Sequence, residues 1–445
     1  MSMPLTQHMT ELFRLAAPVI VSRTGVMTMV VVGVAFLGRV GAEQVAFMAI
    51  AGVAIGTMII GTVGLMVGTM VETAHALGAG KASECGQVWR RSLLYALLIG
   101  LAGAVLCQFG EPLFLATGQT PEIAAGGGYV LEIMGWCLPG VALYVTTTFF
   151  LEAIKRPEPG MVAILFANLL NAFLNWLFVL GNWGLPAMGA AGSAIAITVT
   201  RTAMAVGLIA YVLLMRDHAR FAVRVRPTRP WRDGAAARSI GYASGASYGL
   251  EAAAFGSMSL FAGWLGALPL AAWSISLNCS AMAFMTAVGL GVGTAVRVGH
   301  ARGRGDRAEM ATAGWVGLSA CMLVMALASV VFVLLSPLLA AVFTSDPALA
   351  PLAAAMIAMA AWFMIADGGQ GVMLSAVRGT GDTWIPTAMH FTAYFGVMIP
   401  TAWILTFPLG LGAPGLFLAI LIASIVALGL LCWRFWQRCR PPSRS

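Results

Sequence analysis

Two acidic residues interrupt apolar segments of this chain, and their side chains have the chemistry to bind a small cation. Asp367 lies in FMIADGGQGVML and Glu251 in GYASGASYGLEAAAF, each among residues typical of a lipid-embedded helix. A charged side chain at the bilayer centre costs at least ~2.5 kcal/mol, so it is expected to face the protein interior or a water-filled cavity. Carboxyl groups there can exchange protons, or bind Na⁺ together with hydroxyl and carbonyl oxygens. The alternative is a structural ion pair of one or both acids with a buried arginine.

The distance of each acid from a basic helix end predicts that the two lie at a similar depth. Asp367 lies eleven residues before Arg378, about 16 Å along a helix that rises 1.5 Å per residue. Glu251 lies thirteen residues after Arg238, about 20 Å along its helix. The sequence therefore predicts that Glu251 and Asp367 form one cation site for H⁺ or Na⁺, with no further cofactor.

Other polar residues in apolar segments are candidates for a cavity wall or for its support. Arg23 in VIVSRTGVM and Arg201 in ITVTRTAMAVG are either structural counter-ions or cavity residues that favour anionic groups. Asn168, Asn171 and Asn175 fall at i, i+3 and i+7, which places them on one stripe of a helix. Such a stripe either provides hydrogen bonds for helix packing or contributes to a network around a cation or solvent.

The composition indicates that these residues belong to an integral membrane protein. Of the 445 residues 60% are hydrophobic and only 9% are charged, whereas a soluble domain carries about a quarter charged residues. The long apolar stretches match the ~18 to 20 residues that cross a bilayer as a helix, and no alternating pattern predicts a barrel. Twelve spans are expected, at approximately 15–37, 45–71, 92–109, 128–150, 161–181, 189–215, 240–263, 269–296, 311–335, 351–376, 384–407 and 412–433.

The Lys and Arg residues predict the orientation of these spans. Connections after even-numbered spans are rich in Lys and Arg, above all the loop at 216–238, whereas those after odd-numbered spans hold only Arg39. By the positive-inside rule both termini are expected in the cytoplasm. The +8 net charge is therefore topological, with attraction to membrane lipids, and does not indicate nucleic-acid binding. Seven scattered cysteines show neither metal-ligand nor disulfide spacing.

An internal repeat predicts the domain organisation. Residues 64–80 (GLMVGTMVETAHALGAG) and 289–305 (GLGVGTAVRVGHARGRG) agree at ten of seventeen positions, at an offset of 225 residues. Each copy closes the second span of its half and enters a basic loop, so the halves have the same orientation. We therefore expect an all-α membrane protein with twelve transmembrane helices in two six-helix bundles related by a parallel repeat. The expected domains are residues 1–215, a cytoplasmic linker at 216–238, and residues 239–445.

Several stretches resemble the multidrug and toxic compound extrusion family of secondary antiporters. They span essentially the whole chain and include ELFRLAAPVI, ETAHALGAGK, LEAIKRPEPGM, GLEAAAF and, most specifically, ADGGQGVMLSAVRGTGD. The resemblance, strongest to the NorM-like branch, assigns cation coupling to Glu251 and Asp367, with Gln370, Arg378 and Asp382 as neighbouring pattern positions. It implies a monomer in the bacterial inner membrane that exports organic, often cationic and amphipathic, compounds in exchange for inward H⁺ or Na⁺ by alternating access.

The sequence departs from the family pattern in its first span. Family members usually carry an aspartate there within a VDTxMxG-like stretch, but VVGVAFLG places Gly33 at that position. The resemblance therefore implies no cation site on a carboxylate at this place, and coupling should depend on the C-terminal bundle. Without that acid, and with Arg23 nearby, the preference for cationic compounds is a weaker expectation.

Two functions remain open from the sequence. The first is the cation-coupled exporter of small organic molecules. The second is a flippase or exporter of an anionic or lipid-linked metabolite, with Arg23 and Arg201 contacting its head group. An intramembrane enzyme would need a DDxxD cluster, an HExxH motif or a Ser/His pair at depth, and the sequence contains none of these, so we expect no enzyme.

Overall fold

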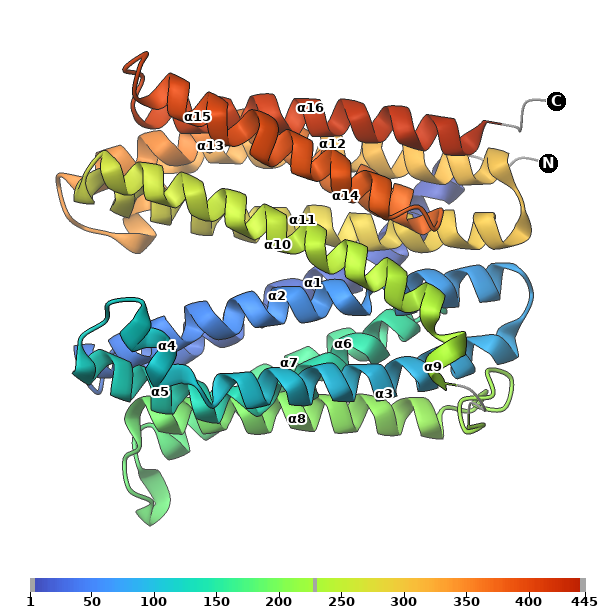
Figure 1. Cartoon of the computed structure of the whole chain (residues 1–445), viewed down its shortest axis with the longest axis horizontal. Coiled ribbons are helices and arrows are strands. Elements are labelled where there is room, and N and C mark those ends of the chain that lie inside the picture. The colour runs from blue at the N-terminus through green and yellow to red at the C-terminus, as the bar shows by residue number, and fades with distance from the viewer. Residues whose placement is uncertain (1–4, 227–229, 441–445) are drawn as a thin grey trace. The chain divides into compact units, whose positions relative to one another are not determined.

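The computed structural model describes residues 5–226 and 230–440, and every regular element in these ranges is a helix (Figure 1). Residues 227–229 of the expected linker, and the tail beyond residue 440, lie outside the described residues. In the described ranges, ten helices are long and apolar enough to cross a membrane, and one bent helix pair provides an eleventh span. Ala235–Trp264, which is richer in glycine and serine, is the twelfth long helix. The prediction of an all-α membrane protein is confirmed.

The long helices follow the expected order of spans. Those of the first half are α1 (Leu5–Leu37), α2 (Ala42–Gly78), α3 (Ala82–Cys107), the pair α5 (Pro121–Gly135) and α6 (Cys137–Ala153), α7 (Glu158–Phe178) and α8 (Gly189–Leu214). Those of the second half are α10 (Ala235–Trp264), α11 (Ala267–Arg304), α12 (Arg307–Phe343), α13 (Leu349–Gly379), the series α14 (Trp384–Phe391), η2 (Thr392–Met398) and α15 (Ile399–Thr406), and α16 (Ala413–Cys439). Short helices α4 (Gly110–Ala116), η1 (Asn182–Gly184) and α9 (Pro230–Asp233) lie in connections.

Several helices extend beyond the spans expected from the sequence. The span expected at 15–37 is part of a helix that begins at Leu5, and the span expected at 269–296 continues to Arg304. The sequence segments were divided at charged residues, but Arg, Glu and Lys are good helix formers and do not end a helix. The helix therefore continues past the end of the apolar span.

Two helices of the membrane region are interrupted close to a proline. The break between α5 and α6, with an angle of 41°, lies just before Pro139. A proline ring clashes with the carbonyl four residues earlier, which here belongs to Gly135. The π-helical segment η2 is followed by Pro400, whose missing N–H leaves a carbonyl of the preceding turn without its usual donor.

The chain forms two compact units. Within the described residues, the C-terminal unit contains residues 246–440 together with residues 5–20, and the N-terminal unit contains residues 21–245. Helices α1 and α10 therefore each contribute residues to both units. Close helix contacts at the repeated glycines explain this division in part.

Repeated glycines allow these contacts inside each unit. In the N-terminal unit, a Cβ on Gly68 of α2 would lie 1.9 Å from the Ala237 carbonyl oxygen of α10, so only glycine fits there. In the C-terminal unit, a Cβ on the equivalent Gly293 of α11 would lie 3.1 Å from the Leu12 side chain of α1. In each copy of the sequence repeat, the glycine thus allows a close contact with another helix of its own unit.

A charged cluster fixes the first turns of α1 within the C-terminal unit. Arg297 of α11 is 4% exposed and donates hydrogen bonds to the His8 carbonyl oxygen, at 3.0 Å, and to His8 Nδ1. Its guanidinium also lies 3.8 Å from the carboxylate of Glu11 and 3.7 Å from that of Glu309 on α12. The cluster therefore ties α1 to α11 and α12.

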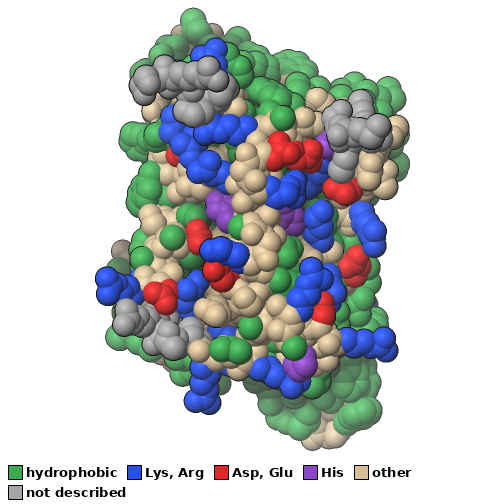
Figure 2. All heavy atoms as spheres, turned by 90° about the vertical axis from the view of Figure 1, so that its right-hand side faces the viewer, with side chains coloured by type: hydrophobic (Ala, Val, Ile, Leu, Met, Phe, Trp, Pro, Cys, Tyr) green, Lys and Arg blue, Asp and Glu red, His purple; other side chains and the backbone are tan. Residues whose placement is uncertain are grey.

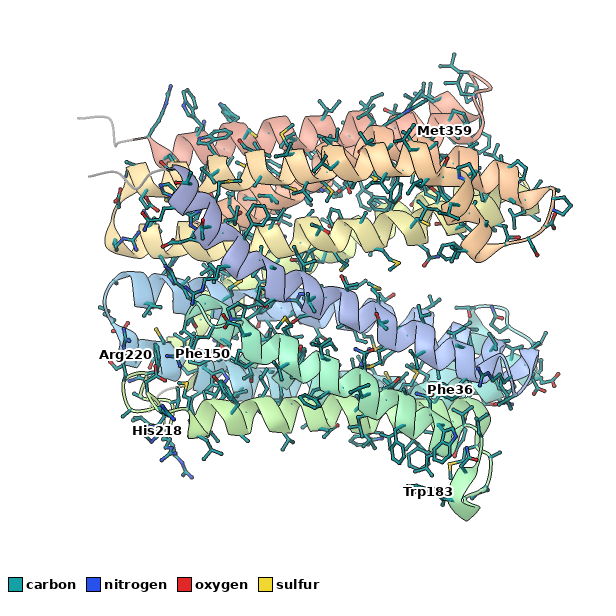
Figure 3. The ribbon with its side chains drawn as sticks, turned by 180° about the vertical axis from the view of Figure 1, so that it is seen from behind. Phe36, Phe150, Trp183, His218, Arg220 and Met359 are labelled. Atoms are coloured by element: carbon teal, nitrogen blue, oxygen red, sulfur yellow. The ribbon has the colours of Figure 1, made fainter. Side chains whose placement is uncertain are left out.

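Basic side chains mark one end of the helices. Figure 2 views the molecule from the end at which α16 finishes, and Lys and Arg side chains gather on this face. The loop after α8 begins with residues that pack on the N-terminal unit, because Asp217 pairs with Arg156 at 2.7 Å and Gly86 N–H donates to Phe221 at 3.0 Å. Phe150, His218 and Arg220 accordingly lie close to one end of the helices, far from Trp183 at the α7–α8 connection (Figure 3).

Candidate cation site

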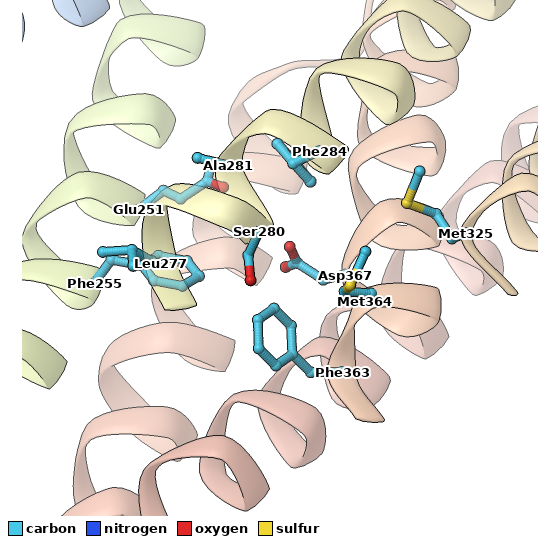
Figure 4. Close-up of a pocket in the computed structure, with 10 residues that line it drawn as sticks. All are labelled: Glu251, Phe255, Leu277, Ser280, Ala281, Phe284, Met325, Phe363, Met364 and Asp367. Atoms are coloured by element: carbon cyan, nitrogen blue, oxygen red, sulfur yellow. The ribbon is translucent and has the colours of Figure 1, made fainter. Parts of the chain in front are cut away.

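A cavity in the C-terminal unit is lined by both acids that the sequence singled out (Figure 4). Its volume is about 160 Å³. Glu251 of α10 and Asp367 of α13 reach it from different helices, and Ser280 of α11 lies between them. The rest of the wall is apolar and includes Phe255, Leu277, Phe284, Met325, Phe363 and Met364. The structure thus brings together two residues that are far apart in sequence.

Glycines beside Asp367 allow α13 to approach its neighbours. A Cβ on Gly368 would lie 2.6 Å from Met325 Cγ of α12, and one on Gly371 would lie 3.4 Å from the Phe284 ring of α11. The helix backbone is therefore held close to α12 and α11 on both sides of the carboxyl group. This packing leaves Asp367 only 6% exposed, at the cavity wall.

Both hydrogen bonds to Asp367 within the described residues reach the same carboxylate oxygen. Gln370 Nε2 and Ser424 Oγ each donate to Oδ1 at 3.3 Å. Gln370 Nε2 also donates to the hydroxyl of Tyr394, at 3.1 Å, in the π-helical segment η2. The predicted supporting residue Gln370 therefore connects Asp367 to a buried tyrosine.

His390 extends this network, and the sequence analysis did not single it out. Its Nε2 lies 2.9 Å from Gln370 Oε1, and its Nδ1 lies 3.1 Å from the hydroxyl of Ser247 on α10. Ser247 and His390 are thus a buried Ser/His pair, which the sequence did not reveal because the two residues are 143 positions apart. His390 is fully buried, and its ring meets that of Tyr394 edge to face at 5.2 Å. A histidine within the apolar span expected at 384–407 was the available signal.

Among the described residues, neither acid of the cavity has an ion-pair partner. Within the described residues, no Lys, Arg or His nitrogen lies within 4.0 Å of the Glu251 or Asp367 carboxylate. Arg378 is buried, but it stacks on the Tyr248 ring at 4.8 Å, and its Nε and Nη2 atoms have no hydrogen-bond partner among these residues. Asp382 lies apart and pairs with Arg434 at 2.6 Å.

The oxygen atoms around the cavity suit a small hard cation or a proton. Two carboxylates and the Ser280 hydroxyl offer the oxygen ligands that hard cations prefer. In the described part of the chain no group of three His, Cys, Asp or Glu side chains could hold a metal ion. Any ion bound here would therefore share its coordination between these few oxygens and water.

The N-terminal unit contains a buried acid that was not among the candidates from the sequence. Glu152 of α6 is 2% exposed, and Arg23 of α1 lies 3.7 Å from its carboxylate. Arg23 also lies over the Phe149 ring at 5.5 Å. Both carboxylate oxygens of Glu152 lack a hydrogen bond among the described residues. Its position at the end of an apolar segment, three residues before Lys155, was the signal in the sequence.

The remaining candidates of the N-terminal unit have separate partners. Arg201 donates to the Cys137 thiol at 3.4 Å, so the structure does not place it with Arg23. Asn168 donates to the Gly25 carbonyl oxygen of α1 at 3.0 Å. Asn175 donates to Asn171 of the same helix at 2.8 and 3.1 Å. The stripe thus makes packing and intrahelical hydrogen bonds, although Asn168, Asn171 and Asn175 each retain a polar atom without a partner among the described residues.

The position of the missing first-span acid is closely packed. Gly33 is buried, and a Cβ there would lie 3.3 Å from the Ser193 hydroxyl of α8. Ser193 Oγ has no hydrogen-bond partner among the described residues. A longer side chain at residue 33 would therefore point toward an unsatisfied hydroxyl, but the chain has no carboxylate at this place.

A family profile and individual related sequences match this chain over most of its length. The MatE family profile matches residues 18–177 and 244–404. A relative from Caulobacter vibrioides, described as "Probable multidrug resistance protein NorM", is 37% identical over 97% of this chain and 92% of its own length. A Bradyrhizobium diazoefficiens protein of the same description is 31% identical over 98% of this chain and 95% of its own length.

Solved structures show the same fold at lower identity. The crystal structure of the eukaryotic MATE transporter AtDTX14 has a TM-score of 0.88 and 19% identity, and covers 98% of both chains. An outward-facing multidrug resistance MATE family transporter has a TM-score of 0.89 and 17% identity, over 96% of this chain and 95% of that one.

Proposed function

The chain belongs to the MatE family of multidrug efflux transporters, and we propose that it is an antiporter that exports organic compounds in exchange for inward H⁺ or Na⁺. Members of this family are transporters and not enzymes. The observation that carries the proposal is the cavity that Glu251 and Asp367 share, in which neither acid has an ion-pair partner among the residues that the structure describes. Two carboxylates at one cavity in a membrane unit are costly unless they bind something positive.

The cation is proposed to bind between the two acids. Glu251 and Asp367 provide charge, and Ser280 provides a neutral oxygen from a third helix. A cation held by α10, α11 and α13 stabilises the arrangement of these helices in which all three oxygens converge. An ion can shift an alternating-access equilibrium only through such a difference in affinity between conformations.

The membrane potential would supply useful driving force for this exchange. One charge that moves inward across 100 mV releases about 2.3 kcal/mol, which corresponds to roughly a 50-fold gradient of an exported neutral compound. The transported compounds are proposed to be organic and amphipathic. A general preference for cationic compounds is not part of the proposal, because Gly33 replaces the first-span acid and Arg23 lies in the same unit.

Replacing Asp367 by Asn tests this function. In proteoliposomes with imposed pH or Na⁺ gradients, the wild-type protein should accumulate a fluorescent organic dye, and D367N should let the dye only equilibrate, because the variant cannot gain a negative charge on that side chain. A panel of cationic, neutral and anionic dyes, with the two gradients imposed separately, identifies the ion and the preferred charge.

The matched control is Asp346→Asn, the same chemical change at an exposed residue in the connection before α13. Asp346 accepts a hydrogen bond from Ala348 N–H at 2.8 Å, and the asparagine side-chain oxygen can accept the same hydrogen bond. D346N should transport as the wild-type protein does. Dye accumulation by D367N at the wild-type level would remove Asp367 from the proposed mechanism.

A further inference from the structure

We infer that His390 is a positioning residue for this cation site: it holds the Gln370 side chain with its amino group toward Asp367 and so leaves Asp367 Oδ2 to receive the ion. The inference rests on the proposed function, because it concerns the same carboxylate. It adds a residue from α14 that contacts neither the cavity nor Asp367.

The direction of the hydrogen bonds at Gln370 is set by its neighbours. The Asp367 carboxylate can only accept a hydrogen bond while it is charged, so the atom 3.3 Å away must be the amino group of Gln370. The carbonyl oxygen of the same amide then faces His390 Nε2 at 2.9 Å. A carbonyl oxygen only accepts, so His390 Nε2 must carry the hydrogen.

This assignment also fixes the other side of the imidazole. A neutral histidine with hydrogen on Nε2 has an accepting Nδ1, and the Ser247 hydroxyl lies 3.1 Å from it and can donate. Ser247, His390 and Gln370 therefore form one chain in which every donor meets an acceptor. The chain ends at Asp367 Oδ1, which the Ser424 hydroxyl also contacts.

The charged and titratable groups around His390 agree with a neutral ring. Its contacts are with Ser247 of α10, Gln370 of α13 and Tyr394 of η2, none of which carries a counter-charge. Arg378 of α13 is the charged side chain that acts electrostatically on the His390 ring, and its positive charge disfavours a second positive charge there. Glu251 and Asp367, the acids of the unit's cavity, make no hydrogen bond to the ring within the described residues.

Loss of the hydrogen bond between His390 and Gln370 should change how readily Asp367 is protonated or binds Na⁺. Without a donor at its carbonyl oxygen, the Gln370 amide can rotate and turn that oxygen toward Asp367. An oxygen there disfavours the carboxylate and favours its protonated form, whereas the amino group favours the carboxylate. His390 thus sets how readily Asp367 gives up its proton or accepts Na⁺, although it does not contact either ion.

Two substitutions separate this role from a general packing role. In His390→Gln the new amide can reach the position of Nε2 and still donate to Gln370. In His390→Asn the shorter amide reaches only the position of Nδ1, beside Ser247, and the contact with Gln370 is lost. Both variants keep a polar group in the buried site. Thermal melting in detergent is the measurement that checks whether each variant folds.

The measurement is dye export by proteoliposomes as a function of pH and of Na⁺ concentration. H390N should move the pH midpoint upward, or raise the Na⁺ concentration for half-maximal export, by on the order of tenfold in ion concentration, the effect of one hydrogen bond to a charged group. H390Q should keep the wild-type midpoint. In a D367N background, neither substitution should change the remaining ion dependence.

The possible failures are distinct. Ion-coupled export by D367N at the wild-type level would overturn the proposed function. Loss of coupling in D367N, combined with an unchanged midpoint in H390N, would overturn only the role of His390. Equal shifts in H390N and H390Q would also overturn it, since the Gln370 contact would then not be the cause.

Discussion

Glu152 and Arg23 show how strongly a single residue can depend on its partner. The Glu152 carboxylate is almost fully buried and its only ion-pair partner among the described residues is Arg23, at 3.7 Å. Removal of one member of a buried ion pair typically costs about 3 to 5 kcal/mol, because the other charge stays buried. We therefore expect Arg23→Met to lower the melting temperature of the purified protein substantially.

The double variant R23M/E152Q is the control for this prediction. It removes both charges, so it should recover most of the stability lost in R23M, as measured by thermal unfolding in the same detergent. If R23M melts at the wild-type temperature, Glu152 does not need a cation, and the pair is not ionic.

Some of these residues could be predicted from the sequence, and their partners could not. Asp367 and Glu251 stand out because a charge within an apolar span needs a reason in any fold. His390 and Gln370 are twenty residues apart in sequence and lie on different helices, so their contact depends on the rotation of α14 relative to α13. Local sequence patterns carry no information about such a rotation.

At the scale of helices, the repeated glycines make a prediction that depends on what each one touches. Gly68 meets the backbone of Ala237, which cannot move aside without shifting α10, whereas Gly293 meets the flexible side chain of Leu12. Gly68→Ala should therefore destabilise the protein by about 1 to 3 kcal/mol, the usual cost of overpacking, and Gly293→Ala by less.

Gly52 of the same helix α2 provides the matched control. No atom lies within 4 Å of a Cβ placed there, and its backbone is helical. Gly52→Ala should therefore leave stability unchanged or raise it, by up to about 1 kcal/mol, through its higher helix propensity. Equal melting temperatures of the Gly68→Ala and Gly52→Ala proteins would contradict the close contact with α10.

The elements themselves were largely predictable, for a clear physical reason. Hydrophobic length selects membrane spans without reference to tertiary structure, and all twelve expected spans coincide with helical segments of the described chain. The bend between α5 and α6 was not predicted, because the effect of a proline on a helix depends on whether its neighbours stabilise the break.

At the scale of the whole molecule, the charge distribution predicts its orientation in the membrane. Trp183 is 76% exposed in the connection between α7 and α8, and Arg304 ends α11. With the termini in the cytoplasm, a cysteine at residue 183 should react with a membrane-impermeant maleimide added to intact cells, and a cysteine at residue 304 should react only after lysis.

A background without the seven native cysteines gives the clearest result, although five of these are buried. If the cysteine at residue 304 reacts in intact cells and the cysteine at residue 183 does not, the orientation is the opposite of the predicted one. The same experiment tests whether the basic loops follow the positive-inside rule.

The cluster around Arg297 has a consequence for biosynthesis. During synthesis, His8 leaves the ribosome 289 residues before its partner Arg297. At about 5 to 20 residues per second, the start of α1 waits roughly 15 to 60 s before the helices that receive it exist. During that interval nascent chains carry an apolar first helix whose leading turns have no native partner, so early release or truncation before α11 should produce a product for quality-control proteases.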